Sequence, residues 1–433
     1  MAPSNEVASI QIGGKLAVVI FIFTLLAFVV ESELTQYVQT TLNYRQPYFL
    51  FYIVHSSFLI TFPIHILYLR LTSSHSISSL LRGLAVAITN HLVPTQRKRA
   101  SDHVYASTRF PYKKFFKLAL GLTFGISTPA MLWFMSVSLS SMTDITAIWN
   151  TNAFFAYIIS VKLFKLKWEP KRLLAVLLAT IGTFMVVYGG AKASSALGDA
   201  VPSSSSPSTT THSMSTSKPS APLIGNLLTL IAAFGYGLYQ VMYKIYAALP
   251  SDPDELVVEP SASVSRTRSG GGEYEHLSTN AEDIDAEEDA EQDESSSYPT
   301  PTPPPAPPFA LYPNLLTSLL GLLTLLTLWL PLPLLHLSSL EIFHPPPSCT
   351  VWAGIAGIAG TGVVFNAGFM ILLGVWGPVI VSVGNLLTIV GVLGVDIVFG
   401  PGLQALTVWS LVGSSGIVGA FGVLVWDMVY KKG

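Results

Sequence analysis

The stretch "TDITAIWNTNAFF", from Thr143 to Phe155, places an aspartate, two asparagines and three threonines in a part of the chain that is otherwise apolar. Lipid contact does not explain such a helix, because hydrocarbon offers a polar side chain no hydrogen-bond partner. The polar groups must therefore face other helices or a water-filled cavity. The rest of the sequence shows what kind of protein surrounds them.

The composition is that of an integral membrane protein. Of the 433 residues, 50% are hydrophobic and only 11% are charged, against about 25% charged in a typical soluble domain, and the mean hydropathy is +0.54. The single cysteine, Cys349, cannot form a disulfide within the chain, and there is no Cys/His cluster with the spacing of a zinc site. We predict no cofactor, no metal and no nucleic-acid partner.

Ten segments are long and apolar enough to cross a bilayer, which takes about 20 residues in a helix. They are 15–33, 47–69, 114–138, 143–164, 171–190, 222–247, 309–335, 351–374, 377–399 and 404–426. The segment 309–335 contains "WLPLPLLHL", so we expect its prolines to bend or end it near Pro331.

Lysine and arginine fall mostly on one side of these segments. With the N-terminus in the cytosol, the opposite side carries only Arg45, Lys192 and Lys218. Cytosolic connections are enriched in basic residues, so we predict that both termini are cytosolic. The basic connection 70–112 is either a topology signal or a contact for anionic lipid headgroups.

Two linkers are too polar to bury a core and are expected to be disordered. Residues 191–221 are Ser/Thr-rich and non-cytosolic, and residues 248–308 are acidic, Pro-rich and cytosolic. The acidic linker is a solvated tether or a docking site for a cytosolic partner. The predicted divisions of the rest are tail 1–14, first five-helix repeat 15–190, helix 222–247, helices 309–426 and tail 427–433.

An internal repeat relates the two halves. "FMSVSLSSMTDITAIWN" (134–150) aligns without gaps with "FMILLGVWGPVIVSVGN" (369–385), an offset of 235 residues that pairs Asn150 with Asn385. Both stretches cover the junction of the third and fourth helices in a set of five. Because five is odd, the second set enters from the opposite side. We therefore predict an all-α integral membrane fold of ten transmembrane helices, arranged as two inverted five-helix repeats.

The fourth helix carries most of the candidate site. Asp144, in its first turn, either caps free N–H groups or binds a proton or cation. Thr146 and Asn150 share one face, which either bonds a neighbouring helix or lines a cavity, and Asn385 lies at the mirrored depth. Asn152 is expected to point elsewhere.

The sixth helix carries an aromatic stripe of Tyr236, Tyr239, Gln240 and Tyr243, which either packs or holds an organic cation. We expect Lys244 to extend to the cytosolic headgroups.

The second helix contains His55 and His65, which are candidates for a proton relay or for bonds to a neighbouring helix. Glu31, Glu33 and Asp396 are expected to lie at helix ends, in the membrane interface.

These features resemble the drug/metabolite transporter superfamily (EamA-like), and within it the F-type, thiamine-transporter-like branch of the solute carrier 35 family. The stretches that carry the resemblance are "SMTDITAIWNTNAFFAYIISVKLFKLKWEPKRLLAVLLATIGTFMVVYGG", "GLYQVMYK", "ESELTQYVQ", "YRQPYFLFYIVHSS", "VFNAGFMILL" and "GVDIVFG". The resemblance implies solute transport by alternating access, with thiamine among the substrates of some members and the vacuole among their membranes.

We therefore expect a secondary-active transporter of a small organic solute, such as thiamine or another organic cation, and not an enzyme. Asn150, Thr146, Tyr239, Gln240 and Asn385 are predicted to bind the solute, and Asp144 and His55 to couple protons or cations. A nucleotide-sugar antiporter and a non-transporting receptor or scaffold remain alternatives. An intracellular membrane such as vacuole or Golgi is expected, with the plasma membrane and a homodimer left open.

Overall fold

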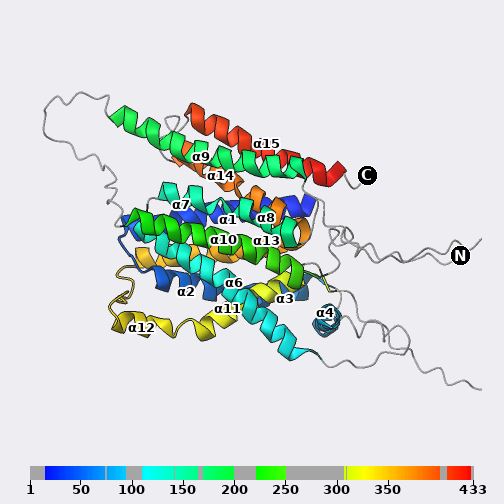
Figure 1. Cartoon of the computed structure of the whole chain (residues 1–433). Helices are drawn as coiled ribbons and strands as arrows, with labels where there is room; N and C mark the ends of the chain where they lie inside the picture. The colour runs from blue at the N-terminus through cyan, green and yellow to red at the C-terminus, as the bar shows by residue number, and fades with distance from the viewer. Residues whose placement is uncertain are drawn as a thin grey trace, which may run out of the picture.

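The computed structural model describes residues 15–73, 76–93, 110–140, 142–163, 169–198, 221–249, 307–308, 310–399 and 407–430. Every regular element in these ranges is a helix (Figure 1). The longer helices are α1 (Lys15–Gln36), α4 (Ile77–Leu92), α6 (Tyr112–Leu139), α9 (Pro170–Gly198), α10 (Pro222–Tyr246), α11 (Leu311–Thr327), α13 (Cys349–Asn385) and α15 (Val408–Tyr430). The shorter ones are α2 (Pro47–Ser57), α3 (Thr61–Thr72), α7 (Met142–Trp149), α8 (Asn152–Leu163), α12 (Pro331–Leu337) and α14 (Leu387–Phe399), with a π-helical turn at Tyr37–Thr41 and a 3-10 turn at Phe58–Ile60.

Six helices among the described residues are long and apolar enough to cross a membrane, or up to seven if the bent pair α11 and α12 is one span. The six are Leu16–Thr41, Pro47–Thr72, Tyr112–Leu139, Pro222–Tyr246, Cys349–Asn385 and Val408–Trp426. The chain is therefore an all-helical protein of membrane-spanning type. The bend of 41° between α11 and α12 falls at Pro331, as the proline pattern predicted.

The predicted segments differ from the structure in several places, and 143–164 and 171–190 have no counterpart among these six helices. The first span continues to Thr41, so Glu31 and Glu33 do not lie at its end. The predicted spans 351–374 and 377–399 are covered by α13 and α14, and the backbone of α13 is non-helical at Gly377 (φ 76°, ψ 171°), where the prediction divided them. Glycine tolerates this positive φ, and Pro378 supplies no N–H to the preceding turn.

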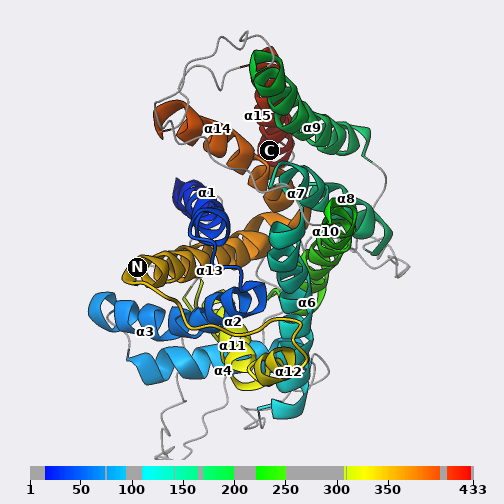
Figure 2. The ribbon, with the colours of Figure 1, turned by 90° about the vertical axis from the view of Figure 1, so that its left-hand side faces the viewer.

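The helices form a main bundle and a flanking layer (Figure 2). In the main bundle α1 packs along α13, α10 packs along α6, and α2 and α11 complete the core. In the flanking layer α9 packs along α15 through glycines, since a Cβ on Gly413 would come within 2.4 Å of the Gly182 carbonyl oxygen. A second apolar cluster joins this layer to α8 and to the end of α13.

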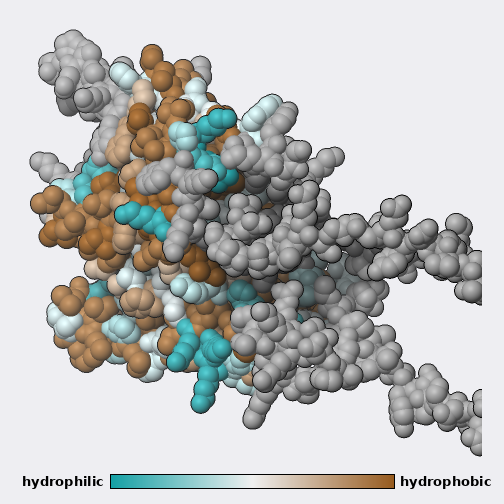
Figure 3. Space-filling model, turned by 45° about the vertical axis from the view of Figure 1, so that its right-hand side comes forward, coloured by the Kyte–Doolittle hydropathy of each residue, from teal (hydrophilic) through white to brown (hydrophobic). Residues whose placement is uncertain are grey.

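The outer surface suits contact with lipid. Large apolar side chains are exposed along several helices, among them Phe23 on α1, Phe124 on α6 and Leu223 on α10. Apolar residues cover much of the described surface in Figure 3. Buried polar side chains such as Gln240 and Asn152 lie inside the bundle, which is the inverse of a soluble protein and follows from an apolar solvent.

Hydrogen bonds join connections that the charge pattern assigns to the same side. After α1, Tyr44 and Gln46 donate to the carbonyls of His344 and Ile342, which precede α13, over 2.8 Å each. The Glu341 carboxylate accepts from the first free N–H groups of α2, those of Tyr48 and Phe49. We call residues 338–348 the strap, because they tie this end of α2 to the start of α13.

Two further contacts also join segments that the charge pattern assigns to the same side of the membrane. The Ala221 N–H, at the start of α10, donates to the carbonyl of Leu139, at the end of α6. At the opposite end of α10, a ring nitrogen of His91 on α4 lies 3.0 Å from the Tyr246 carbonyl oxygen. The first residues of α1 and the last residues of α15 lie toward the same side of the bundle (Figure 1).

Candidate functional site

The centre of the candidate site is the stripe on α10. Tyr236, Tyr239, Gln240 and Tyr243 are all buried, and Gln240 has no exposed surface. The hydroxyl of Tyr239 donates to the sulfur of Met370 on α13 over 2.9 Å. The stripe therefore faces α13 and the bundle interior.

Gln240 joins three helices. Its amide nitrogen donates to Oδ1 of Asn152 on α8 over 3.3 Å, and its amide oxygen accepts from the hydroxyl of Ser382 on α13. The same hydroxyl is 2.6 Å from the Pro378 carbonyl oxygen, next to the kink at Gly377. Asn152 was expected to point away from the site, and it is instead the direct partner of Gln240. Ser382 was missed, because its place beside Gln240 depends on the kink.

Asn150 and Asn385 both lie where a helix is interrupted. α7 ends at Trp149 and α8 begins at Asn152, so Asn150 lies in the break, and its amide donates to the Thr146 carbonyl over 2.7 Å. In the second half α13 ends at Asn385 and α14 begins at Leu387. Both asparagines are buried. A side-chain amide in such a break can satisfy carbonyls that the interrupted helix leaves free.

The remaining predicted residues lie at different places. Thr146 is half-buried on α7 and contributes its carbonyl to Asn150. Asp144 is half-buried in the first turn of α7. His55 is buried on α2 between the rings of Phe51 and Phe58, with centroid distances of 4.7 Å to each. The structure therefore does not bring His55 into direct contact with the Gln240 network.

Two other predictions concerned neighbouring polar residues. His65 bonds a neighbouring helix, since its Nδ1 lies 2.7 Å from the amide nitrogen of Asn314 on α11. Lys244 does not extend away from the bundle: its ammonium group donates to the Gly374 carbonyl on α13 over 2.8 Å. The kink of α13, three residues later, helps to leave that carbonyl free.

The carboxylate of Glu31 is a feature that the sequence reasoning placed wrongly. Its residue is 8% exposed, and it faces α13, where a Cβ on Gly362 would lie 3.1 Å from its Oε1. Within the described part of the chain, its Oε2 has no hydrogen-bond partner. Glu31 lies near the end of the predicted segment 15–33, so the sequence did not indicate its burial, which depends on the approach of α13.

Aromatic rings from α1, α7, α10 and α13 contact one another inside the bundle. Tyr236 contacts Trp149 at a centroid distance of 4.9 Å and Phe369 at 5.5 Å. Phe369 contacts Phe365 at 5.6 Å, and Phe365 contacts Phe28 on α1 at 4.7 Å. Among the described residues, neither the Tyr236 hydroxyl nor the Trp149 indole N–H has a hydrogen-bond partner. The region therefore offers aromatic faces and unused hydrogen-bonding groups.

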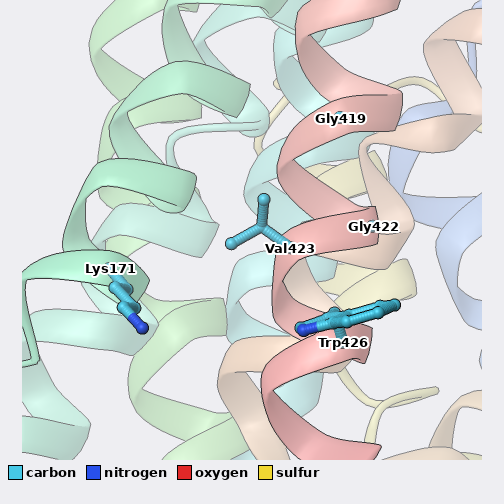
Figure 4. A pocket seen from close by; sticks show the side chains of 5 residues that line it. All are labelled: Lys171, Gly419, Gly422, Val423 and Trp426. Carbon is cyan, nitrogen blue, oxygen red and sulfur yellow. The ribbon is translucent and has the colours of Figure 1, made fainter.

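Two pockets lie outside the Gln240 network. The larger, of about 420 Å³, lies between α9 and α15 and is lined by Lys171, Gly419, Gly422, Val423 and Trp426 (Figure 4). The smaller, of about 90 Å³, lies at the end of the tyrosine stripe, beside Tyr243, Tyr312 and Gly374. Among the residues that the structure describes, no group of three or more His, Cys, Asp or Glu side chains could hold a metal ion.

Comparison with known proteins gives no family. No family model matches the chain, and no curated protein matches it. Thirteen chains of known structure match. One of them, described as "Crystal structure of protein", has 12% sequence identity and a TM-score of 0.47, over 94% of this chain and 96% of its own. A likeness at that TM-score carries no argument about fold or activity.

Proposed function

We propose that the protein is a secondary-active transporter that moves a small organic solute, such as thiamine or another organic cation, by alternating access. The observation that carries the proposal is the Gln240 network, in which a buried amide is bonded to Asn152 of the first half and Ser382 of the second. Polar groups from both halves that meet inside a membrane bundle are typical of transporter sites.

The paired helix breaks support the inverted repeat of ten spans. The first break is at Asn150 and the second follows Asn385, and the sequence alignment equates these two residues. Interrupted helices at corresponding places in two repeats are a frequent feature of secondary transporters, because the freed backbone groups can contact solute or ions. The agreement between the sequence offset and the breaks favours two related halves.

The contacts between connections support the predicted sharing of one membrane side by these connections. The strap bonds the connection after α1, and the start of α10 bonds the end of α6. Each pair is assigned to the non-cytosolic side by the distribution of lysine and arginine. The resemblance to the F-type solute carrier 35 branch adds the solute class and an intracellular membrane, such as that of the vacuole.

In this proposal Asn150, Thr146, Tyr239, Gln240 and Asn385 contact the solute at some stage of the cycle. The amides and the hydroxyl bond its polar groups, and the tyrosine ring stacks on it. Asp144 and His55 are the coupling candidates from the sequence.

The test is uptake into proteoliposomes by the purified full chain, with labelled thiamine, nucleotide sugars, amino acids and polyamines. Saturable uptake of an organic cation, lost in Asn150→Ala and Asn385→Ala proteins that remain folded, is the expected result. Saturable uptake of a nucleotide sugar would mean that the solute is a nucleotide sugar and not an organic cation. Absence of uptake for every solute, by folded and inserted protein, would favour a receptor or scaffold.

A further inference from the structure

The helices α9 and α15 touch at one point of their contact and separate beyond it. A Cβ on Gly413 would lie 2.4 Å from the Gly182 carbonyl oxygen, and a Cβ on Gly416 would lie 3.7 Å from the nearest side-chain atom of α9. Further along α15, a Cβ on Gly419 or Gly422 would meet no atom within 4 Å. The two helices therefore form a V that is closed at Gly413 and open beyond Gly419.

The open part of the V is the pocket of about 420 Å³. We call it the α9–α15 groove. Lys171 and Val423 point into the space between the two helices, and the nitrogen end of the Trp426 ring is turned toward α9 (Figure 4). Val423 and Trp426 are exposed. The groove therefore opens on the outer face of the flanking layer, where lipid surrounds the helices.

The groove has the depth of one membrane leaflet. At ~1.5 Å per residue, Lys171 lies about 16 Å along α9 from Gly182, where the helices touch. Half of a hydrocarbon core of ~30 Å is about 15 Å. Trp426 ends the last spanning helix, and tryptophan is enriched at the level of the lipid headgroups. The open end of the groove therefore lies at the membrane surface, and the closed end lies near the bilayer centre.

The open end of the groove is basic. The connection 162–172 contains five basic residues and one acidic residue, Glu169. The Glu169 carboxylate is 2.9 Å from Nε of Arg172, and among the described residues no ion pair involves Lys171. The first N–H groups of α9 add partial positive charge at the same place. Asp427 follows Trp426 in the sequence, and its side chain is outside the described residues.

We propose that the α9–α15 groove binds one anionic phospholipid from the leaflet on the Lys171 side, which the charge pattern assigns to the cytosol. The lipid phosphate accepts hydrogen bonds from the Lys171 ammonium group. An acyl chain lies along Gly419, Gly422 and Val423 and fills the space between the diverging helices. The site does not depend on transport, because it is on the outer face of the bundle and not at the Gln240 network.

Two other occupants fit the groove less well. One turn of a helix, 5.4 Å long and 10–12 Å wide, occupies about 400–600 Å³, so a second copy of the chain could insert a single turn at most. The two copies of a symmetric dimer would also bring their basic ends together at the same membrane surface. A soluble anion would contact Lys171 and leave the apolar length of the groove empty.

The test is native mass spectrometry of the purified full chain in a neutral detergent, titrated with phosphatidylserine, phosphatidylcholine or inorganic phosphate. The wild type should bind one phosphatidylserine per chain, at least fivefold more tightly than phosphatidylcholine. Lys171→Gln should remove this headgroup preference, and Lys171→Arg should retain it. Lys162→Gln is the matched control, because Lys162 is an exposed lysine of the same connection that does not line the groove, and it should also retain the preference.

A second variant tests the apolar part of the groove. The side chain of Gly422→Leu would enter open space, so it should weaken the binding of both lipids at least tenfold. Gly121→Leu, on α6, is its control, because a Cβ there also meets nothing within 4 Å, and it should bind both lipids like the wild type. Melting followed by circular dichroism shows whether each variant is folded.

Four results in folded protein would overturn the phospholipid site. The first is equal binding of the two lipids, or of neither, by the wild type. The second is a headgroup preference that is unchanged in Lys171→Gln. The third is binding of inorganic phosphate without lipid, which would mean a site for a soluble anion. The fourth is a dimer that carries no lipid and is lost in Gly422→Leu, which would assign the groove to a second copy of the chain.

Discussion

The bond between Gln240 and Asn152 can be measured as a coupling energy. Gln240→Leu removes the hydrogen-bond donor to Asn152 Oδ1. Asn152 is only 1% exposed, so water cannot replace that donor. An orphaned buried acceptor costs roughly 1–3 kcal/mol. Ser382 keeps its bond to the Pro378 carbonyl, so its hydroxyl adds little. We expect the single variant to lose about 1–3 kcal/mol of unfolding free energy.

Asn152→Leu should cost a similar amount, because it leaves the Gln240 amide nitrogen without an acceptor. The double variant replaces both polar groups with apolar ones, which can be nearly neutral. Its cost should therefore fall below the sum of the single costs by about 1–2 kcal/mol, the range expected for residues in contact. The double-mutant cycle isolates the bond from the packing change at each residue.

The assay is equilibrium unfolding in detergent micelles titrated with a denaturing detergent, followed by circular dichroism. Gln36→Leu, a half-buried glutamine of α1 outside the network, serves as the matched control, and it should show no coupling to Asn152→Leu. Additive costs within ~0.5 kcal/mol would refute the reasoning. They would mean that the Gln240 amide is not bonded to Asn152 in the membrane protein.

Three other predictions concern packing, pH and orientation. Gly413→Ala should destabilise the chain by about 1–3 kcal/mol, because the new Cβ would lie 2.4 Å from a backbone oxygen. Gly419→Ala is the control: its new Cβ would meet no atom within 4 Å, so it should be neutral in the same unfolding assay. Burial raises the pKa of Glu341 above its ordinary value of 4.5, outweighing the N–H groups that lower it. The stability that this proton contributes is therefore present below pH 4.5 and lost as the pH rises through the raised pKa. Over that pH range, the melting temperature of the wild type should fall relative to that of Glu341→Gln. A constant difference between the two melting temperatures would contradict this. Cys349 is exposed and is the first residue of α13, so an impermeant maleimide should label it only from the non-cytosolic side of sealed vesicles. Ser79→Cys in a Cys349→Ser background should be labelled only from the cytosolic side. The reverse pattern would invert the predicted topology.

Much of the membrane architecture could be predicted from the sequence, for a physical reason. Hydrocarbon accepts only apolar side chains and internally bonded helices, so the apolar segments at 47–69, 114–138 and 222–247 each correspond to a spanning helix. The stripe of α10 also follows from local periodicity, because residues three and four apart share one face of a helix. Pro331 marks the bend after α11, since proline cannot continue the hydrogen-bond ladder.

The interior of the bundle was decided by the tertiary structure. Glu31 was predicted at an interface because it lies at the end of the first predicted segment, but the packing of α1 on α13 through Gly362 buries it. Asn152 was expected to face away, and the break after Trp149 turns it toward Gln240. Periodicity fixes which residues share a helix face, but it does not fix which helix covers that face.

The candidate site, too, was predicted from the sequence only in part. The sequence by itself determined that polar groups lie within apolar segments, and an ungapped alignment within it pairs Asn150 with Asn385. Only the tertiary structure decided that both asparagines occur at helix breaks and that aromatic rings from α7, α10 and α13 contact one another there, with a further contact between α1 and α13. A break or a kink redirects every residue that follows it, so contacts between distant helices depend on backbone geometry that local patterns do not specify.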